Sequence, residues 1–185
     1  HPDFKISFSI TGTWLEQAAK WAPDLITTIR KMVRKGQVEI LGETYYHSLA
    51  FFENLEEFEA QVDLHTTAIQ KIFGVTPRVF RNTELAYNDN LAHWAEEKGY
   101  AGILAEGWDK ILKNRTPNHV YRPTGCENLK LLLKNYRLSD DIAFRFSNHD
   151  WKEWPLTVKK CQNWVDMDCL RGNLINLFMD FETFG

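Results

Sequence analysis

The stretch RVFRNTELAYNDNLAHWAEEKGYAGIL, residues 78–104, predicts a strand, a helix and a second strand in that order. The apolar run at 78–81 passes into polar residues, Asn88 and Asp89 are suited to begin a helix, and the chain is apolar again at 101–104. Two strands joined through a helix in this way are typically parallel, with a right-handed crossover. The stretch therefore predicts a parallel βαβ unit.

The same alternation extends along the rest of the chain. Apolar runs of strand length and segments of helical periodicity follow one another on both sides of this unit. The short strands are apolar on both faces and end in polar residues, which favours an α/β fold with a parallel (β/α) barrel or a doubly wound sheet. We expect strands at 5–10, 38–41, 129–135 and 173–179, and helices at 13–35 with Thr13 as the cap and a break at Pro23, 54–73 with Asn54 as the cap, 137–147 and 157–169.

Composition restricts the classes of function. The chain has 185 residues, of which 44% are hydrophobic, and a formal net charge of −3, which suits one domain with a core over residues 1–185. No basic run suggests a nucleic-acid partner, and no apolar segment approaches the ~18 residues of a membrane span. Cys126, Cys161 and Cys169 form no CxxC pair, which favours a reduced cytoplasmic compartment. The oligomeric state is not indicated.

Acidic side chains follow several of the predicted strands. Glu84, Glu106 and Asp180 each come directly after one. Because parallel strands end at the same edge of a sheet, Glu84 and Asp180 are expected to lie at one edge although 96 positions separate them. Two carboxylates facing one cleft are the minimum requirement for glycoside hydrolysis. The alternative is structural: such acids also cap helices or pair with Arg81 or Arg122.

Nucleotide and metal motifs are not found. The sequence contains neither GxGxxG nor GxxxxGK[ST], and its histidines show no metal-ligand spacing. Aromatic residues make up 14% of the chain, which fits either a ring-rich core or a site for a flat-faced ligand such as a sugar. We therefore expect no metal or other cofactor. The histidines concerned are His47, His65, His93, His119 and His149.

Three motifs carry a more specific signal. GQVEILG (36–42), FRNTELAY (80–87) and FMDFETFG (178–185), in this order, resemble three conserved regions of glycoside hydrolase family 57. TYYHSLA (44–50) and the stretch 120–147 are similar to its α-amylase-type branch. The resemblance implies an incomplete, seven-stranded parallel (β/α) barrel. This chain would be a fragment of it that lacks the first strand, with its His-Gln-Pro motif, and the C-terminal helical region.

The resemblance also assigns roles to individual residues. Glu84 falls on the position of the catalytic nucleophile and Asp180 on that of the general acid/base. Glu39 falls on an active-site glutamate. His47 is expected to contact sugar, and Glu182 to orient Asp180. Two aromatic side chains are expected either to stack on glucose or to pack in the core, namely Tyr46 and Trp108.

The expected activity is the retaining hydrolysis of α-1,4-glucosidic bonds in glucans of the starch and glycogen type. Double displacement of this kind requires the two carboxyl groups to be about 5–5.5 Å apart. Three alternatives stay open: a 4-α-glucanotransferase of the same family, a metal-dependent polysaccharide deacetylase, and a glucan-binding relative without catalysis. The deacetylase would need an Asp and two His in ligand spacing.

Overall fold

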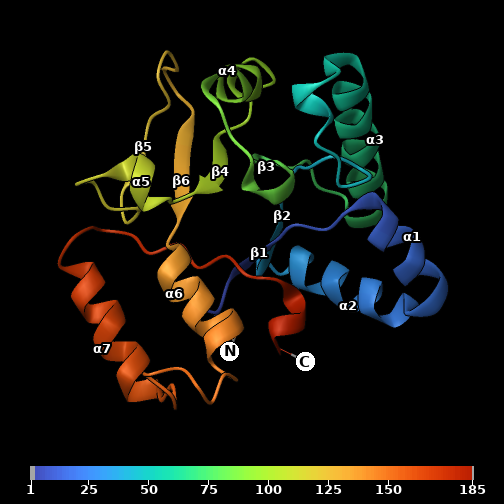
Figure 1. The fold of residues 1–185 in the computed structure, drawn as a ribbon. Coiled ribbons are helices and arrows are strands. Elements are labelled where there is room, and N and C mark those ends of the chain that lie inside the picture. The colour runs from blue at the N-terminus through green and yellow to red at the C-terminus, as the bar shows by residue number, and fades with distance from the viewer. Residues whose placement is uncertain (1–2, 185) are drawn as a thin grey trace. The chain divides into compact units, whose positions relative to one another are not determined.

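The computed structural model describes residues 3–184. Residues 1, 2 and 185, which belong to the predicted domain range and to the motif at 178–185, lie outside the described residues. The chain forms two compact units (Figure 1). The first unit runs to Ile103 and includes Pro123–Leu129, and the second comprises Leu104–Arg122 and the residues from Lys130 onward. The single domain over 1–185 stays a prediction.

Helices and strands alternate through the first unit, as the sequence predicts. The second strand of the βαβ unit, β4, begins in the first unit and ends in the second. The elements of the first unit are β1 (Ile6–Phe8), α1 (Gly12–Trp21), α2 (Pro23–Arg34), β2 (Val38–Ile40), η1 (Ala50–Phe52), α3 (Leu55–Phe73), β3 (Val79–Arg81), η2 (Thr83–Leu85), α4 (Asp89–Glu97) and the start of β4 (Gly102–Glu106).

Local sequence signals fix the helix ends. The Asn54 side chain accepts the Glu57 backbone N–H and begins α3, and Gly74, with φ of 77°, ends it in the left-handed conformation that glycine tolerates. α2 starts at Pro23, as predicted. The prediction of Thr13 as the first cap is wrong. Thr11 accepts the Trp14 N–H instead, because α1 begins at Gly12.

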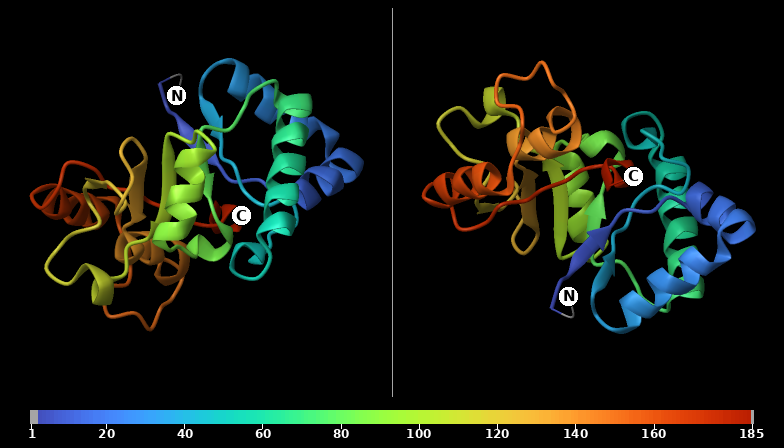
Figure 2. Two further views of the ribbon diagram at one scale, coloured as in Figure 1. Left: turned by 90° about the horizontal axis from the view of Figure 1, so that it is seen from above. Right: turned by 90° about the horizontal axis from the view of Figure 1, so that it is seen from below.

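The first unit contains a parallel sheet, which confirms the predicted α/β class. β1 pairs with β2 in parallel, with Ile6 opposite Val38 and Phe8 opposite Ile40. An isolated parallel bridge then joins Gly42 to Phe80 in β3. Helices α1, α2 and α3 lie on one side of β1 and β2 in both views of Figure 2. The barrel arrangement of the strands stays a prediction.

An aromatic cluster packs directly behind the end of β3. Phe58, Phe80 and Trp94 meet edge to face, with ring centroids 4.7 Å (Phe58–Trp94), 5.1 Å (Phe80–Trp94) and 5.9 Å (Phe58–Phe80) apart. All three side chains are buried. Interlocking rings of this kind add roughly 0.5–1.5 kcal/mol per pair beyond the area they bury. The backbone that leads to Glu84 is therefore anchored in a rigid core.

The second unit combines strands, short helices and a long extended segment. β6 lies between the end of β4 and β5, and β5 pairs with it antiparallel, a hairpin that the sequence analysis missed. The predicted helices at 137–147 and 157–169 are present as α6 with the π-turn η3, and as α7. The elements are α5 (Asp109–Leu112), β5 (Val120–Tyr121), β6 (Lys130–Lys134), α6 (Tyr136–Asp140), η3 (Asp141–Arg145), α7 (Val158–Cys169) and η4 (Phe181–Phe184).

The strand predicted at 173–179 is wrong, because this segment is extended but forms no ladder. Its first N–H groups, at Asn173 and Leu174, both donate to the Asn118 carbonyl (3.0 and 3.1 Å). Asn118 is itself held in a buried polar cluster, where the Asn135 amide donates to Asn118 Oδ1 (3.0 Å) and to Asp168 Oδ2 (2.6 Å). The segment thus bonds mainly to loop groups, and it reaches β6 through the Asn176 amide, which donates to the Leu133 carbonyl (3.0 Å).

A carboxylate fixes the segment Pro123–Leu129 within the first unit. Glu96 Oε1 accepts the backbone N–H groups of Glu127 (3.0 Å), Asn128 (2.6 Å) and Leu129 (2.9 Å). These bonds, that of Asn128 foremost, lower the pKa of Glu96 because they favour its ionised form. The charge on Glu96 therefore contributes to stability.

We expect Glu96→Gln to lower the melting temperature at pH 7, because an amide presents one acceptor oxygen and no charge. A group whose pKa is lower in the folded state stabilises above its unfolded pKa, about 4.3 for glutamate, and that contribution is lost as the pH falls through the folded pKa. The difference between wild type and variant should shrink below about pH 4. Glu97→Gln on the same helix is the control, and a difference independent of pH would contradict the assignment.

Candidate active site

The loops that follow β2 and β3 come together and form the candidate site. His47 Nε2 lies 3.1 Å from Glu84 Oε1, within hydrogen-bond distance. Beside this contact, the hydroxyl groups of Thr44 and Thr83 lie 3.2 Å apart. Thr44 Oγ1 also accepts the Ser48 backbone N–H (2.8 Å) and thereby closes the loop that carries His47. Two of the predicted site residues, His47 and Glu84, are therefore brought together.

The backbone at these positions is strained. His47, Glu84 and Leu85 have φ values of 57°, 56° and 55°, in the left-handed region that costs a residue with a Cβ roughly 1–2 kcal/mol. Buried Asn82 holds the turn: its carbonyl accepts the Leu85 N–H (3.0 Å), and its amide donates to the Ala86 carbonyl (3.0 Å). Such strain persists where the surrounding structure enforces it, most often at functional sites.

A buried carboxylate that the sequence analysis missed lies behind His47. Only 1% of the Glu43 surface is exposed. Its Oε1 accepts the Ser9 hydroxyl (2.7 Å), and its Oε2 lies 3.7 Å from His47 Nδ1 and 4.0 Å from Arg81 Nη1. Oε2 accepts no hydrogen bond from the described residues, so His47 and Arg81 are the nearby groups that compensate its burial. The available signal was its place four residues before His47, directly after β2, as Glu84 follows β3.

The backbone of Glu84 is fixed in the strained turn, whereas its carboxylate is exposed. Its side chain is 74% exposed, so the carboxylate can reach a ligand, whereas His47 and the strained turn limit the directions in which it points. The four residues Glu43, His47, Arg81 and Glu84 form an acid–base cluster with an exposed end. Chemically, such a cluster can present an oriented carboxylate to an electrophilic carbon.

Two further predicted residues belong to the first unit. Glu39 lies in the middle of β2 with its side chain exposed, and its Oε2 accepts the Ser7 hydroxyl (2.9 Å). Tyr46 is 54% exposed and meets the Tyr45 ring edge-on, with centroids 4.9 Å apart. The core-packing alternative therefore does not describe Tyr46, which is half exposed. The roles of both residues stay predictions.

The remaining predicted residues belong to the second unit. Asp180 and Glu182 are exposed, and the Asp180 carbonyl accepts the Thr183 N–H (3.2 Å) at the start of η4. The approach to Asp180 is anchored where the Phe178 N–H donates to Ser139 Oγ (3.1 Å). Trp108 is 50% exposed after β4. That Asp180 meets Glu84 in one cleft stays a prediction.

Within residues 3–184 no three His, Cys, Asp or Glu side chains are grouped so that they could hold a metal ion. No helix in the same range has the length and hydrophobicity needed to cross a membrane. The cysteines Cys126, Cys161 and Cys169 are all free thiols.

Comparisons with known proteins identify one family and a relative of this chain. The family model of glycosyl hydrolase family 57 matches residues 1–185. A protein of Methanocaldococcus jannaschii named "Putative alpha-amylase" is 44% identical over 184 residues, which are 99% of this chain and 38% of that protein. The chain thus spans little more than a third of this relative.

Two solved structures share the fold at low sequence identity. The 4-alpha-glucanotransferase of Thermococcus litoralis matches with a TM-score of 0.74 and 18% identity, over 96% of this chain and 27% of the enzyme. A "putative polysaccharide deacetylase" of Mycobacterium smegmatis matches with a TM-score of 0.62 and 18% identity, over 92% of this chain and 55% of that one. At these identities the likeness concerns the fold alone.

We expect Glu43→Ala to lower the free energy of unfolding by about 1–3 kcal/mol, because Ser9 loses its buried acceptor and Arg81 and His47 lose a nearby charge. Glu39→Ala removes an equal side chain from the same segment, but an exposed one, and should stay within about 0.5 kcal/mol of wild type. Urea denaturation measures both. Equal effects of the two substitutions would show that Glu43 does not hold the site together.

Proposed function

The chain belongs to glycosyl hydrolase family 57, and on that premise we propose that it carries the catalytic residues of an enzyme that cleaves α-1,4-glucosidic bonds in starch- or glycogen-type glucans. The observation that carries the proposal is the exposed Glu84 carboxylate, held on a strained turn and bonded to His47 at 3.1 Å. It lies in the motif that resembles the nucleophile region of the family. The products would retain the anomeric configuration.

In the proposed mechanism Glu84 attacks the anomeric carbon and forms a covalent glycosyl-enzyme. His47 supports this role because a positioned partner keeps one oxygen of Glu84 engaged and directs the other toward substrate. The buried charge of Glu43, 3.7 Å behind the imidazole, favours the orientation of His47 in which Nε2 faces Glu84. The three side chains would therefore act in series, with only Glu84 bonding to the sugar carbon.

Asp180 is proposed as the general acid and base. It would protonate the departing oxygen and then take a proton from the attacking water. Both Glu84 and Asp180 follow an extended segment, which is consistent with a barrel whose strand ends present both groups to one cleft. We propose a carboxyl separation of about 5–5.5 Å, within residues 1–185 as a single fragment of an incomplete seven-stranded (β/α) barrel domain.

The other predicted residues would contact or frame the glucan. Tyr46 and Trp108 expose about half of their surfaces, 54% and 50%, and can stack on sugar rings. His47 is near enough to Glu84 to contact the sugar that reacts, and Glu39 is proposed at the same site. Glu182 would orient Asp180. The free thiols support a cytoplasmic location for the enzyme.

Transfer to another sugar is the runner-up to hydrolysis. The 44% identical relative is named an alpha-amylase, which favours water as the acceptor. A polysaccharide deacetylase shares the fold, but that chemistry needs a metal, and residues 3–184 offer no cluster of ligands for one. Elemental analysis for bound zinc would distinguish a deacetylase from a glucan-cleaving enzyme. A relative without catalysis would bind maltooligosaccharides without turning them over.

Incubation of the full-length protein with maltoheptaose, with products resolved by mass, tests the proposal. We expect shorter sugars only, a fall in kcat of about 10³-fold or more for Glu84→Gln, and a fall of about 10²–10⁴-fold for Asp180→Asn. The exposed Glu56→Gln and Asp150→Asn are matched controls.

Two other outcomes carry distinct meanings. Longer sugars that accumulate beside shorter ones would identify a glucanotransferase with the same catalytic pair. Full activity in either Glu84→Gln or Asp180→Asn would contradict the assignment of that residue.

A further inference from the structure

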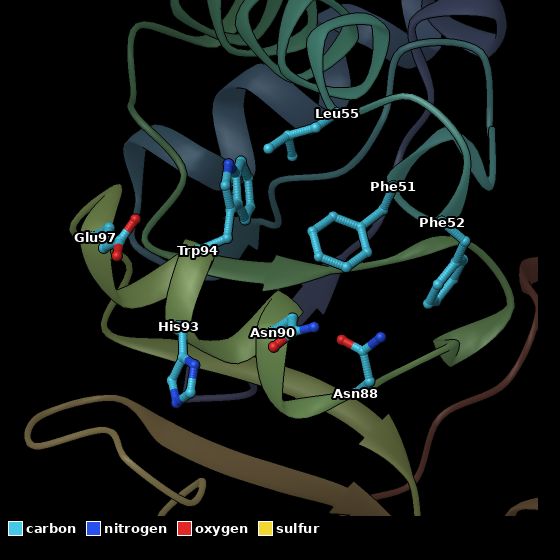
Figure 3. A pocket seen from close by; sticks show the side chains of 8 residues that line it. All are labelled: Phe51, Phe52, Leu55, Asn88, Asn90, His93, Trp94 and Glu97. Carbon is cyan, nitrogen blue, oxygen red and sulfur yellow. The ribbon is translucent and has the colours of Figure 1, made fainter.

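A pocket opens in the first unit where α3 and α4 begin (Figure 3). Its volume is about 460 Å³, within the range of roughly 300–1,000 Å³ that ligand pockets occupy. Apolar side chains from η1 and α3 line one part of it, and polar side chains from the start of α4 line another. No residue assigned above to the candidate active site lines it.

The apolar part of the pocket is rigid and open. Phe52 and Leu55 are 44% and 51% exposed. Phe51 holds Phe52 edge-on, with ring centroids 5.4 Å apart, and itself packs against the buried Phe58 at 5.1 Å. Because these rings are tied to the core, the platform exists before any ligand arrives, so binding orders few side chains.

The polar part consists of the amides of Asn88 and Asn90, the carboxylate of Glu97, and the imidazole of His93, whose Nε2 lies 2.8 Å from the Thr124 carbonyl. Asn88 caps α4, where its Oδ1 accepts the Leu91 N–H (2.9 Å), so its NH₂ group stays available to donate. The Asn90 side chain is exposed beside it (Figure 3). Glu97 adds a carboxylate acceptor. None of the eight lining residues, all within the described range, is Lys or Arg, which disfavours anionic ligands.

The pocket is continuous along the chain with the candidate active site. Exposed apolar side chains recur at every third position from the neighbour of His47 to the pocket: Tyr46, Leu49, Phe52 and Leu55, between 44% and 54% exposed. On the other side, Asn88 follows Glu84 by four residues. The chain segment that leads from His47 to the pocket therefore exposes apolar side chains along its length, which favours a polymer over a small ligand.

We propose that this pocket and the strip Tyr46–Leu49–Phe52–Leu55 bind an α-glucan chain away from the bond that is cleaved. A pyranose ring has an apolar C–H face, which matches Phe52 and Leu55, and a rim of neutral hydroxyls, which matches the amides of Asn88 and Asn90. The inference rests on the proposed function, because it takes its ligand from the substrate of Glu84. The site would favour long glucans over short ones.

Binding is tested in the full-length Glu84→Gln variant, so that no turnover is needed. Calorimetric titration with maltoheptaose should show Kd rising about 5- to 50-fold when Phe52→Ala or Asn90→Ala is added, which corresponds to about 1–2.3 kcal/mol. The exposed Phe144→Ala and Asn163→Ala are matched controls and should leave Kd unchanged. In NMR spectra, maltoheptaose should shift the side-chain NH₂ signals of Asn88 and Asn90.

Unchanged Kd in both pocket variants, or unshifted NH₂ signals, would overturn the inference while leaving the catalytic assignment intact. Failure of the proposed function gives a different result from failure of this inference. In that case the wild-type protein would not cleave maltoheptaose, although maltoheptaose could still bind at this pocket. A fall in melting temperature for Phe52→Ala, with glucan binding unchanged, would show that Phe52 only packs against Phe51 and would also overturn the inference.

Discussion

The contact between His47 and Glu84 is the interaction on which the rest of the site depends. It joins the loop after β2 to the loop after β3, at a distance of 3.1 Å, next to the isolated parallel bridge between Gly42 and Phe80. The buried Glu43 carboxylate lies behind it, and both contact residues, together with Leu85, have left-handed backbone. Burial of charge and backbone strain both cost free energy. The aromatic core under β3 supplies the rigidity that keeps this arrangement in place.

Much of the fold follows from local signals in the sequence. The sequence predicts helix ends at Asn54 and Pro23 because their effects act within a few residues, and the structure has each in that role. Glu43 could not be found in this way. Whether an acid after a strand is buried or exposed depends on elements distant in sequence, here β1 and β3. Glu39 was assigned from the motif that resembles the family, and Glu43 lies outside that motif.

The extended segment before Asp180 is a second feature that local sequence could not predict. Its apolar run has the composition of a strand, but pairing is a property of neighbours, and its N–H groups find loop carbonyls and the Ser139 hydroxyl instead. The family could be inferred from three short motifs, because residue types are specific where the reaction needs particular atoms. That Glu84 and Asp180 lie in one cleft is a proposal. It rests on those motifs and on the rule that parallel strands end at the same edge of a sheet.

Direct trapping of the glycosyl-enzyme tests the central claim, that Glu84 is the nucleophile of a retaining enzyme. The full-length protein would be treated with a fluorinated α-glucosyl fluoride, which forms the intermediate faster than it is hydrolysed, and then digested and analysed by mass spectrometry. We expect one added glycosyl group on the peptide that contains Glu84. A glycosyl group on another residue, or turnover with inversion and no adduct, would contradict it.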